Sequence, residues 1–250
     1  MDSPRRNAIA QIELIRTGRV GVITLKRREH GNRIGEQMAK EAVTAFESVR
    51  KDPALRACVV TGDGDIFCLG GDYESAGSST PRRTSYAQAL SDLDRAMSQL
   101  GKPLIAAVNG DAHAGGFALV IACDLAVMAT EATLGLPEAM KGLFPFIALA
   151  IVRDVVPKKL FFDLVYNARL MRAEEAQAAY LVNEVVPRSS VRERAIELAE
   201  RASTYNSEVV RLGRDLYYGL RGTEPGEALT RSRSALLAAL AAKDRATGPS

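Results

Sequence analysis

The sequence predicts an α/β fold with parallel strands, followed by a helical C-terminal region. Apolar runs of strand length alternate with amphipathic stretches of helix length through most of the chain, and this alternation is typical of parallel sheets. From Ala173 onward the pattern becomes almost entirely helical. We therefore expect a core over residues 1–187 and a helical region over residues 188–250.

Each element is predicted by local periodicity. Residues 11–25 alternate about a turn at Thr17-Gly18-Arg19 and predict a β-hairpin. Helical spacing of apolar residues then predicts a helix over 35–49. The next expected elements are a strand over 57–61, a polar loop over 75–84, a helix over 86–100 and buried strands over 104–108 and 125–128. From Ala173 onward we expect a helix, then a short strand ending at Pro187. The C-terminal region is expected to hold amphipathic helices over 191–202, 207–218 and 225–242.

Composition excludes several classes of function. The 250 residues carry a net charge of only +3 without a cluster of basic residues, so we expect no nucleic-acid partner. No apolar run reaches the ~18 residues that a membrane span needs, and we expect no membrane contact. The start of the chain, residues 1–7, is polar with no apolar segment after it, so we expect no signal peptide.

The three cysteines, Cys58, Cys68 and Cys123, are odd in number and lack the spacing of a metal site. Each lies among apolar residues, which predicts buried, reduced thiols and a cytoplasmic protein. We expect no bound metal.

Two glycines are the strongest functional signal. Gly71 lies in the segment 66–72 and Gly115 in the segment 108–118, and each segment follows an apolar, strand-like run. Both segments have the pattern of a strand, a glycine turn and a helix. Glycine allows close approach of a ligand to the backbone, and a helix N-terminus offers free N–H groups. Two such donors that meet at one oxygen form an oxyanion hole, although spacing alone is equally compatible with two tight turns.

Four segments, in this order, resemble the crotonase family, also called the enoyl-CoA hydratase/isomerase family. They are Val59–Asp72, Lys102–Gly110 with Gly115-Gly116, Cys123–Ala126, and Leu134–Glu138 with Gly142–Pro145. The resemblance runs from about Val20 to Pro187. It implies a core that is a spiral of ββα turns, and C-terminal helices that assemble a homo-trimer or hexamer. It also implies an acyl-CoA thioester substrate, with coenzyme A as part of the substrate and no separate cofactor.

The resemblance assigns roles to three residues. The N–H groups of Gly71 and Gly115 polarise the thioester carbonyl and stabilise an enolate, and Glu138 is the acid–base carboxylate. Family members that add water carry a second carboxylate three residues after the second glycine, where this chain has Ala118. One carboxylate can still move a proton between two carbons, so double-bond isomerisation is slightly favoured over hydration.

The acid–base role requires that an apolar pocket raise the pKa of Glu138, and Phe144 and Phe146 are the expected walls. The competing interpretation is a first-turn carboxylate after Pro137, whose pKa the helix dipole would lower. Phe146 also replaces a family glycine whose N–H helps to hold water. We expect this N–H to stay free and the ring to dry the pocket.

The remaining substrate-binding candidates flank these positions. The resemblance places Arg27 and Arg28 at the phosphates of coenzyme A. Leu69, Gly70, Asp72 and Gly116 lie beside the glycines, and we expect Asp72 to cap the following turn. His113 is either a structural hydrogen-bonding residue or an acid–base group. The second possibility would suit a decarboxylase or hydrolase of a CoA thioester. Because Ala118 has no carboxylate, a non-catalytic acyl-CoA-binding protein also stays open.

Overall fold

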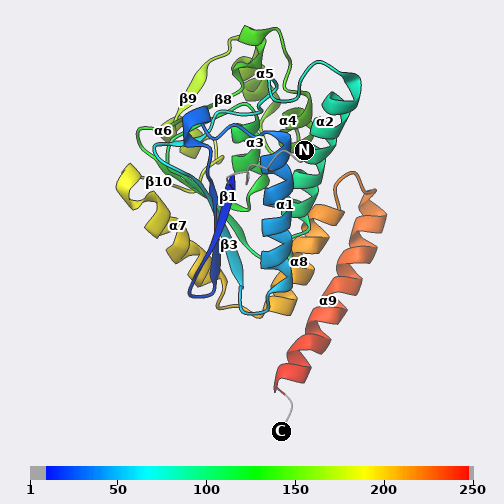
Figure 1. Cartoon of the computed structure of the whole chain (residues 1–250). Helices are drawn as coiled ribbons and strands as arrows, with labels where there is room; N and C mark the ends of the chain where they lie inside the picture. Colours follow the sequence, from blue (N-terminus) through cyan, green and yellow to red (C-terminus); the bar gives the residue numbers. More distant parts are fainter. Residues whose placement is uncertain (1–9, 248–250) are drawn as a thin grey trace, which may run out of the picture.

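The structure is a computed structural model that describes residues 10–247, so the expectation for residues 1–7 lies outside the described part. Two sheets form the centre of the molecule (Figure 1). The larger has the order β1(Ile12–Thr17), β2(Val20–Leu25), β3(Ala57–Gly62), β5(Leu104–Val108), β7(Leu125–Ala129) and β10(Glu184–Val186). The smaller has the order β4(Ile66–Cys68), β6(Asp111–His113), β8(Thr133–Gly135) and β9(Leu170–Arg172).

The chain winds as a spiral of ββα turns. Each turn places one strand in the large sheet and the next strand in the small sheet: β3 and β4, then β5 and β6, then β7 and β8. Strands β2, β3, β5, β7 and β10 are parallel neighbours, and only β1 pairs antiparallel in this sheet. The expected hairpin and the α/β spiral are both confirmed.

The helices are α1(Glu36–Lys51), α2(Thr80–Ser98), α3(Gly115–Ala122), α4(Phe146–Val152), α5(Lys158–Tyr166), α6(Ala173–Ala178), α7(Arg188–Ala202), α8(Ser207–Gly219) and α9(Pro225–Thr247). Two short 3-10 helices, η1(Arg28–His30) and η2(Pro137–Lys141), lie directly after strands β2 and β8. The expected helices are all present. The helix expected over 86–100 begins earlier, at Thr80, because Pro81 in its first turn has the backbone angle that a helix start requires.

One expectation about Gly71 is wrong. No helix begins at this glycine, because the next eight residues form a loop with turns over 73–76, and α2 starts only at Thr80. Asp72 holds the first of these turns, since Ser75 donates its backbone N–H to the carboxylate at 3.2 Å. The helix dipole therefore acts only at Gly115, the first residue of α3.

The two faces of the large sheet are covered by different helices (Figure 1). α1 packs against β1 and β2, with α2 beside it, and α7 packs against β3, β5 and β7 on the opposite face. α7 buries Val191, Ala195 and Ala199 in the common core. The core therefore continues past residue 187, and the expected division into 1–187 and 188–250 stays a prediction.

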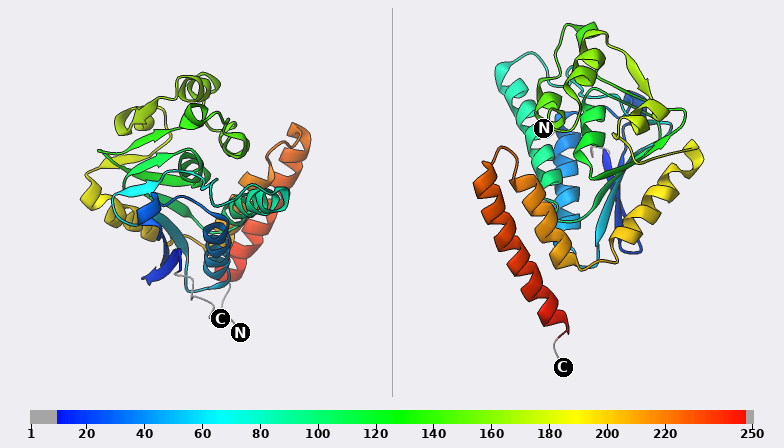
Figure 2. Two further views of the ribbon diagram at one scale, coloured as in Figure 1. Left: turned by 45° about the horizontal axis from the view of Figure 1, so that its top comes forward. Right: turned by 180° about the vertical axis from the view of Figure 1, so that it is seen from behind.

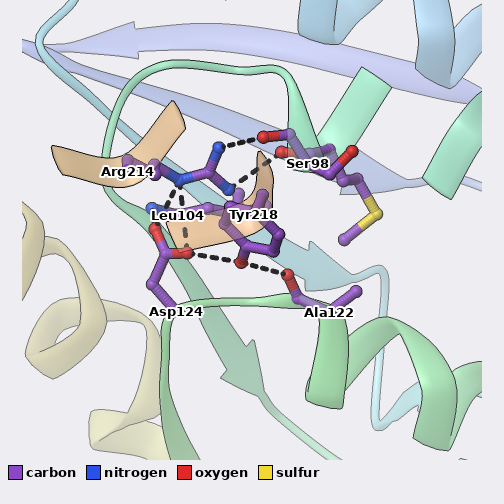
Figure 3. Close-up of polar contacts among 7 residues, drawn as sticks. Ser98, Leu104, Ala122, Asp124, Arg214 and Tyr218 are labelled. Atoms are coloured by element: carbon purple, nitrogen blue, oxygen red, sulfur yellow. Dashed lines mark hydrogen bonds and ion pairs between the residues drawn. The ribbon is translucent and has the colours of Figure 1, made fainter. Parts of the chain in front are cut away.

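A buried arginine attaches α8 to this core (Figure 3). Arg214 donates through Nε to Asp124 at 2.9 Å, through Nη1 to the Ser98 carbonyl at 2.8 Å and through Nη2 to the Met97 carbonyl at 2.8 Å. Tyr218, one turn further along α8, donates to the same Asp124 carboxylate at 2.7 Å. Asp124 also accepts the Leu104 N–H, so one carboxylate links the start of β5 to α8.

α9 packs beside α8 and extends past the rest of the molecule (Figures 1 and 2). Its apolar residues stay largely exposed: Leu229 is 74% exposed, Leu236 59% and Leu237 62%. Over residues 10–247 no helix combines the length and the hydropathy needed to cross a membrane.

Candidate active site

Three parallel strands of the small sheet end at one place. β4, β6 and β8 are neighbours in this order and all run in the same direction. The residues that follow their carboxyl ends are therefore brought to one edge of the sheet, where α/β proteins commonly bind ligands. Gly71 follows β4, Gly115 follows β6 and Glu138 follows β8. All three line the same cavity, although they are far apart in the sequence.

The N–H groups of Gly71 and Gly115 have no protein acceptor among the described residues. Beside Gly71, the parallel bridge to Ile34 uses the N–H groups of Ile34 and Asp72, each at 2.9 Å from its acceptor. Gly115 is the first residue of α3, where no intrahelical acceptor exists. A Cβ atom added to Gly115 would lie 3.5 Å from the Gly71 nitrogen. The two donors thus sit side by side at the cavity.

The backbone is strained just before the second donor. Ala114 has φ 54° and ψ −121°, in a left-handed region that residues with a side chain rarely adopt. Its N–H is fixed by the Gly135 carbonyl of β8 at 2.8 Å. Strain of this kind costs about 1–3 kcal/mol and is concentrated at functional sites. The strained residue forms the link between β6 and α3, directly before the Gly115 donor.

Glu138 is the buried polar group of this cavity. It is only 5% exposed, and its Oε2 atom has no hydrogen-bond partner. Apolar side chains from α2, α3 and α4 form most of the wall, with Leu93, Leu119, Ile147 and Ile151 among them. Burial raises the pKa of Glu138 to about 7, while a hydrogen bond from its own backbone N–H acts in the opposite direction. Of the two expectations for Glu138, the raised pKa is the correct one.

The position of the absent second carboxylate also lies in the cavity. Ala118, on the first turn of α3, is 3% exposed and lines the wall near Gly115. A methyl group therefore occupies the site from which family members with two carboxylates would present the second one. Glu138 has no acid–base partner at this position.

Phe144 and Phe146 were expected to form walls of the pocket, and neither ring lines it. Phe146 is 73% exposed, and its ring packs against Phe144 with the centroids 5.5 Å apart. The Phe146 N–H donates to the Phe144 carbonyl at 2.8 Å and is not free to hold a water molecule. Phe146 is the first residue of α4, whose inner face presents Ile147, Ala148 and Ile151 to the cavity instead.

His113 is held outside the cavity lining. It is the last residue of β6, and its Nε2 lies 2.8 Å from the Thr133 hydroxyl on the neighbouring strand β8. Thr133 in turn donates to Asp111 at 2.8 Å. Burial lowers the pKa of His113, against the opposite effect of the Asp111 charge. The geometry matches the structural interpretation of this histidine.

The basic and acidic candidates near the first glycine bind each other. Arg27 donates to Asp72 at 2.9 Å and to the Arg33 carbonyl at 2.7 Å. Burial of Asp72 acts to raise its pKa, but hydrogen bonds from Arg27 and Ser75 hold it below the ordinary value. Arg27 and Asp72 therefore brace the loop, and Arg28 is exposed nearby.

The remaining candidates have packing functions. Gly70 has φ 99°, and a Cβ there would lie 2.7 Å from that of Ala114. A Cβ on Gly116 would lie 2.0 Å from the Cys68 carbonyl oxygen, so α3 can approach β4 only because this residue is glycine. Leu69 is partly buried, and its side chain covers Gly31. These residues set the positions of the two donors and do not line the cavity.

Two polar residues of the cavity, Tyr73 and Asp94, were not expected from the sequence. Tyr73, in the turn after Gly71, folds its ring back over that glycine, and its pKa is raised by burial and by the nearby Glu138. Asp94 reaches the cavity from α2. The spacing of Leu90, Asp94 and Met97 on one helical face was the available signal for Asp94. Within residues 10–247 no cluster of His, Cys, Asp and Glu could hold a metal ion.

Comparisons with known proteins identify the family. Residues 16–237 match the enoyl-CoA hydratase/isomerase family, and the chain belongs to this crotonase family. It is 34% identical over 194 residues to enoyl-CoA hydratase EchA19 of Mycobacterium tuberculosis, covering 75% of this chain and 73% of that protein. It is 34% identical over 192 residues to carnitinyl-CoA dehydratase of Salmonella typhi, covering 76% and 73%. The structure of enoyl-CoA hydratase from Bacillus anthracis superposes with a TM-score of 0.86 at 28% identity, covering 95% and 94%.

Proposed function

We propose that this protein acts on enoyl-CoA thioesters through an enolate, with Glu138 as the sole acid–base group. One observation carries the proposal. The buried Glu138 carboxylate, with a pKa of about 7, and the unpaired N–H groups of Gly71 and Gly115 line the same apolar cavity. Members of this family act on acyl-CoA thioesters. Loss of one such donor typically costs about 3 kcal/mol of transition-state stabilisation.

The reaction that these groups support best is a shift of a double bond from the 3- to the 2-position. The carboxylate of Glu138 takes a proton from the carbon next to the thioester carbonyl. The electron pair moves onto the carbonyl oxygen, which accepts hydrogen bonds from Gly71 and Gly115. The neutral Glu138 then returns its proton to the fourth carbon, and the enolate collapses to the conjugated enoyl thioester. Ala118 supplies no proton, and none is needed.

Hydration is the second candidate, and the names of relatives favour it. EchA19 is named a hydratase, and the Salmonella typhi protein is named a dehydratase, which is the reverse type of reaction. In this chain, the unpaired Oε2 of Glu138 would accept a hydrogen bond from the attacking water. The same carboxylate would remove the proton of the water and return it to the carbon next to the carbonyl.

A side-by-side assay separates the two reactions. The purified protein is given either trans-2-enoyl-CoA or cis-3-enoyl-CoA of equal chain length, and the products are separated and quantified. Faster formation of trans-2-enoyl-CoA than of 3-hydroxyacyl-CoA supports isomerisation. Turnover of neither compound, together with tight acyl-CoA binding, would support the non-catalytic alternative. Ala118→Glu should raise the share of hydrated product.

The decarboxylase or hydrolase alternative depends on His113 and has less support. The imidazole is bonded to Thr133 and does not line the cavity with Gly71 and Gly115. A malonyl-type thioester, supplied in the same assay, tests this alternative directly.

We propose a homo-trimer or a dimer of trimers for the assembled protein. The exposed leucines of α9, which include Leu236 and Leu237, support an additional contact beyond the fold of one chain. Light scattering at micromolar concentration should give a mass of about three or six chains, and a monomer would rule out the proposal. The expected cytoplasmic location stays a prediction, supported by the free thiols of Cys58, Cys68 and Cys123.

A further inference from the structure

The cavity contains a second carboxylate that the proposed reaction does not use. Asp94 lies on α2 between Leu90 and Met97, and all three residues line the cavity together with Leu93. Residues three and four positions apart share one face of a helix. Asp94 therefore places a charge in an otherwise apolar face that is directed at the proposed substrate site.

This carboxylate has no partner in the described part of the chain. No hydrogen bond and no ion pair to Asp94 is formed there, although it is partly buried. Burial raises the pKa of Asp94, and the charge of Arg221 opposes this shift without forming an ion pair. A partly buried carboxylate with no bonding partner is unfavourable for folding alone. Its neighbours Asp92 and Arg95, on the outer face, form an ion pair with each other.

Asp94 and Glu138 reach the cavity from different elements of the fold. Asp94 enters from α2, whereas Glu138 lies on the 3-10 helix that follows β8. Ala118, where the second family carboxylate is missing, lies on α3, so Asp94 does not occupy that position. Its place on the wall formed by α2 suits contact with the acyl tail.

We propose that Asp94 selects acyl chains that carry a hydroxyl group away from the thioester, by accepting a hydrogen bond from that hydroxyl. The inference depends on the proposed function, because it requires the acyl group to occupy this cavity. The surrounding Leu90, Leu93 and Met97 would enclose the methylene groups of the chain. Sites that hydrogen-bond a substrate hydroxyl discriminate strongly against analogues without it, because the protein group is then left unpaired.

Binding of paired saturated thioesters tests the inference without any turnover. Calorimetry would compare butanoyl-CoA, hexanoyl-CoA and octanoyl-CoA with the same thioesters carrying a terminal hydroxyl. We expect the protein to bind at least one hydroxylated member about tenfold to a hundredfold more tightly than its plain counterpart. Asp94→Leu should abolish this preference and tighten binding of the plain chain, and Asp94→Asn should keep part of the preference because its amide oxygen still accepts.

Asp92→Leu is the matched control, since it makes the same change on the outer face of the same helix. It should leave the preference at the wild-type value. An equal affinity for both members of every pair, or a preference that survives in Asp94→Leu, would overturn the inference.

Turnover of plain trans-2- and cis-3-enoyl-CoA by the same preparations reports on the proposed function separately. If the plain compounds react but no hydroxyl preference exists, only the inference about Asp94 fails. If the preference exists without turnover, the proposed reaction fails and the binding role of Asp94 stands. If no thioester binds, both are wrong.

Discussion

Two buried polar groups in this protein have opposite surroundings. Each of the three guanidinium nitrogens of Arg214 has an acceptor, and together they fasten α8 to the core. Glu138 is equally well buried, yet its Oε2 atom has no partner and its pKa is raised to about 7. Buried polar groups are nearly always hydrogen-bonded when their role is structural. The contrast supports a stabilising role for Arg214 and is consistent with the ligand-binding role proposed for Glu138.

The largest expected effect tests the Glu138 side of this comparison. Glu138→Gln keeps the size of the side chain but cannot shuttle a proton, so turnover of the best enoyl-CoA should fall by roughly 10²–10⁴-fold. Acyl-CoA affinity should change little. Steady-state kinetics and calorimetry measure the two quantities.

The exposed Glu174 supplies the control for this substitution. Glu174→Gln makes the same change on the surface at α6 and should leave both turnover and affinity at wild-type values. If Glu138→Gln turned over every enoyl-CoA at the wild-type rate, Glu138 would not be the acid–base group.

Substitution of Arg214 should lower the free energy of unfolding without a comparable loss of turnover. Arg214→Met leaves Asp124 without its buried cation and frees two backbone carbonyls (Figure 3). We expect a decrease of about 2–3 kcal/mol in the free energy of unfolding, measured by urea denaturation. The folded fraction should keep turnover within about threefold of wild type.

Arg211→Met is the matched control on the same helix. Arg211 forms an exposed ion pair with Asp215, which should contribute less than about 1 kcal/mol. An equal decrease in the free energy of unfolding in both variants would mean that the buried contacts of Arg214 stabilise the fold no more than an exposed ion pair does.

Sequence patterns pointed to the two glycines as oxyanion candidates, because each comes after a strand-like run, whereas Glu138 was assigned by the family resemblance. Glycine is required where two backbone segments approach closely, as at Gly116. A glycine at such a position can be recognised in one sequence without comparison to others. The spiral itself came from family resemblance, since each ββα turn divides its strands between two sheets and leaves no sequence repeat.

The walls of the cavity could not be predicted in the same way. Phe146 is adjacent to Pro145 in the sequence, but the direction of α4 exposes its ring and presents Ile147 to the cavity. Asp94 lies 44 positions before Glu138 and reaches the cavity only because α2 packs against α3 and α4. Such contacts depend on helix packing, which local patterns do not specify.

The raised pKa of Glu138 predicts how activity depends on pH. The carboxylate must be ionised to take a proton, so kcat/KM should fall about tenfold per pH unit below about 7 and level off above it. Because the folded-state pKa lies above the ordinary value of 4.5, ionisation of Glu138 reduces stability as pH rises between these values.

Two measurements check this prediction. A pH series of kcat/KM should show the acidic limb in wild type, and the residual activity of Glu138→Gln should lack it. Denaturation of the same two proteins should show that wild type loses stability relative to Glu138→Gln as the pH rises from 4.5 to 7. A wild-type inflection near the ordinary value would mean that burial does not control this carboxylate.

The smallest expected effect concerns His113, which resembles Arg214 in having a partner and Glu138 in lying close to the cavity. If its bond to Thr133 is purely structural, His113→Ala should lower the free energy of unfolding by about 1 kcal/mol and change turnover by less than about threefold. Thr133→Val removes the same hydrogen bond while keeping the imidazole, so it should have a similar effect on both quantities. A fall in turnover in His113→Ala alone, as large as that of Glu138→Gln, would instead make the imidazole an acid–base group. The CoA-thioester decarboxylase or hydrolase would then become the better assignment.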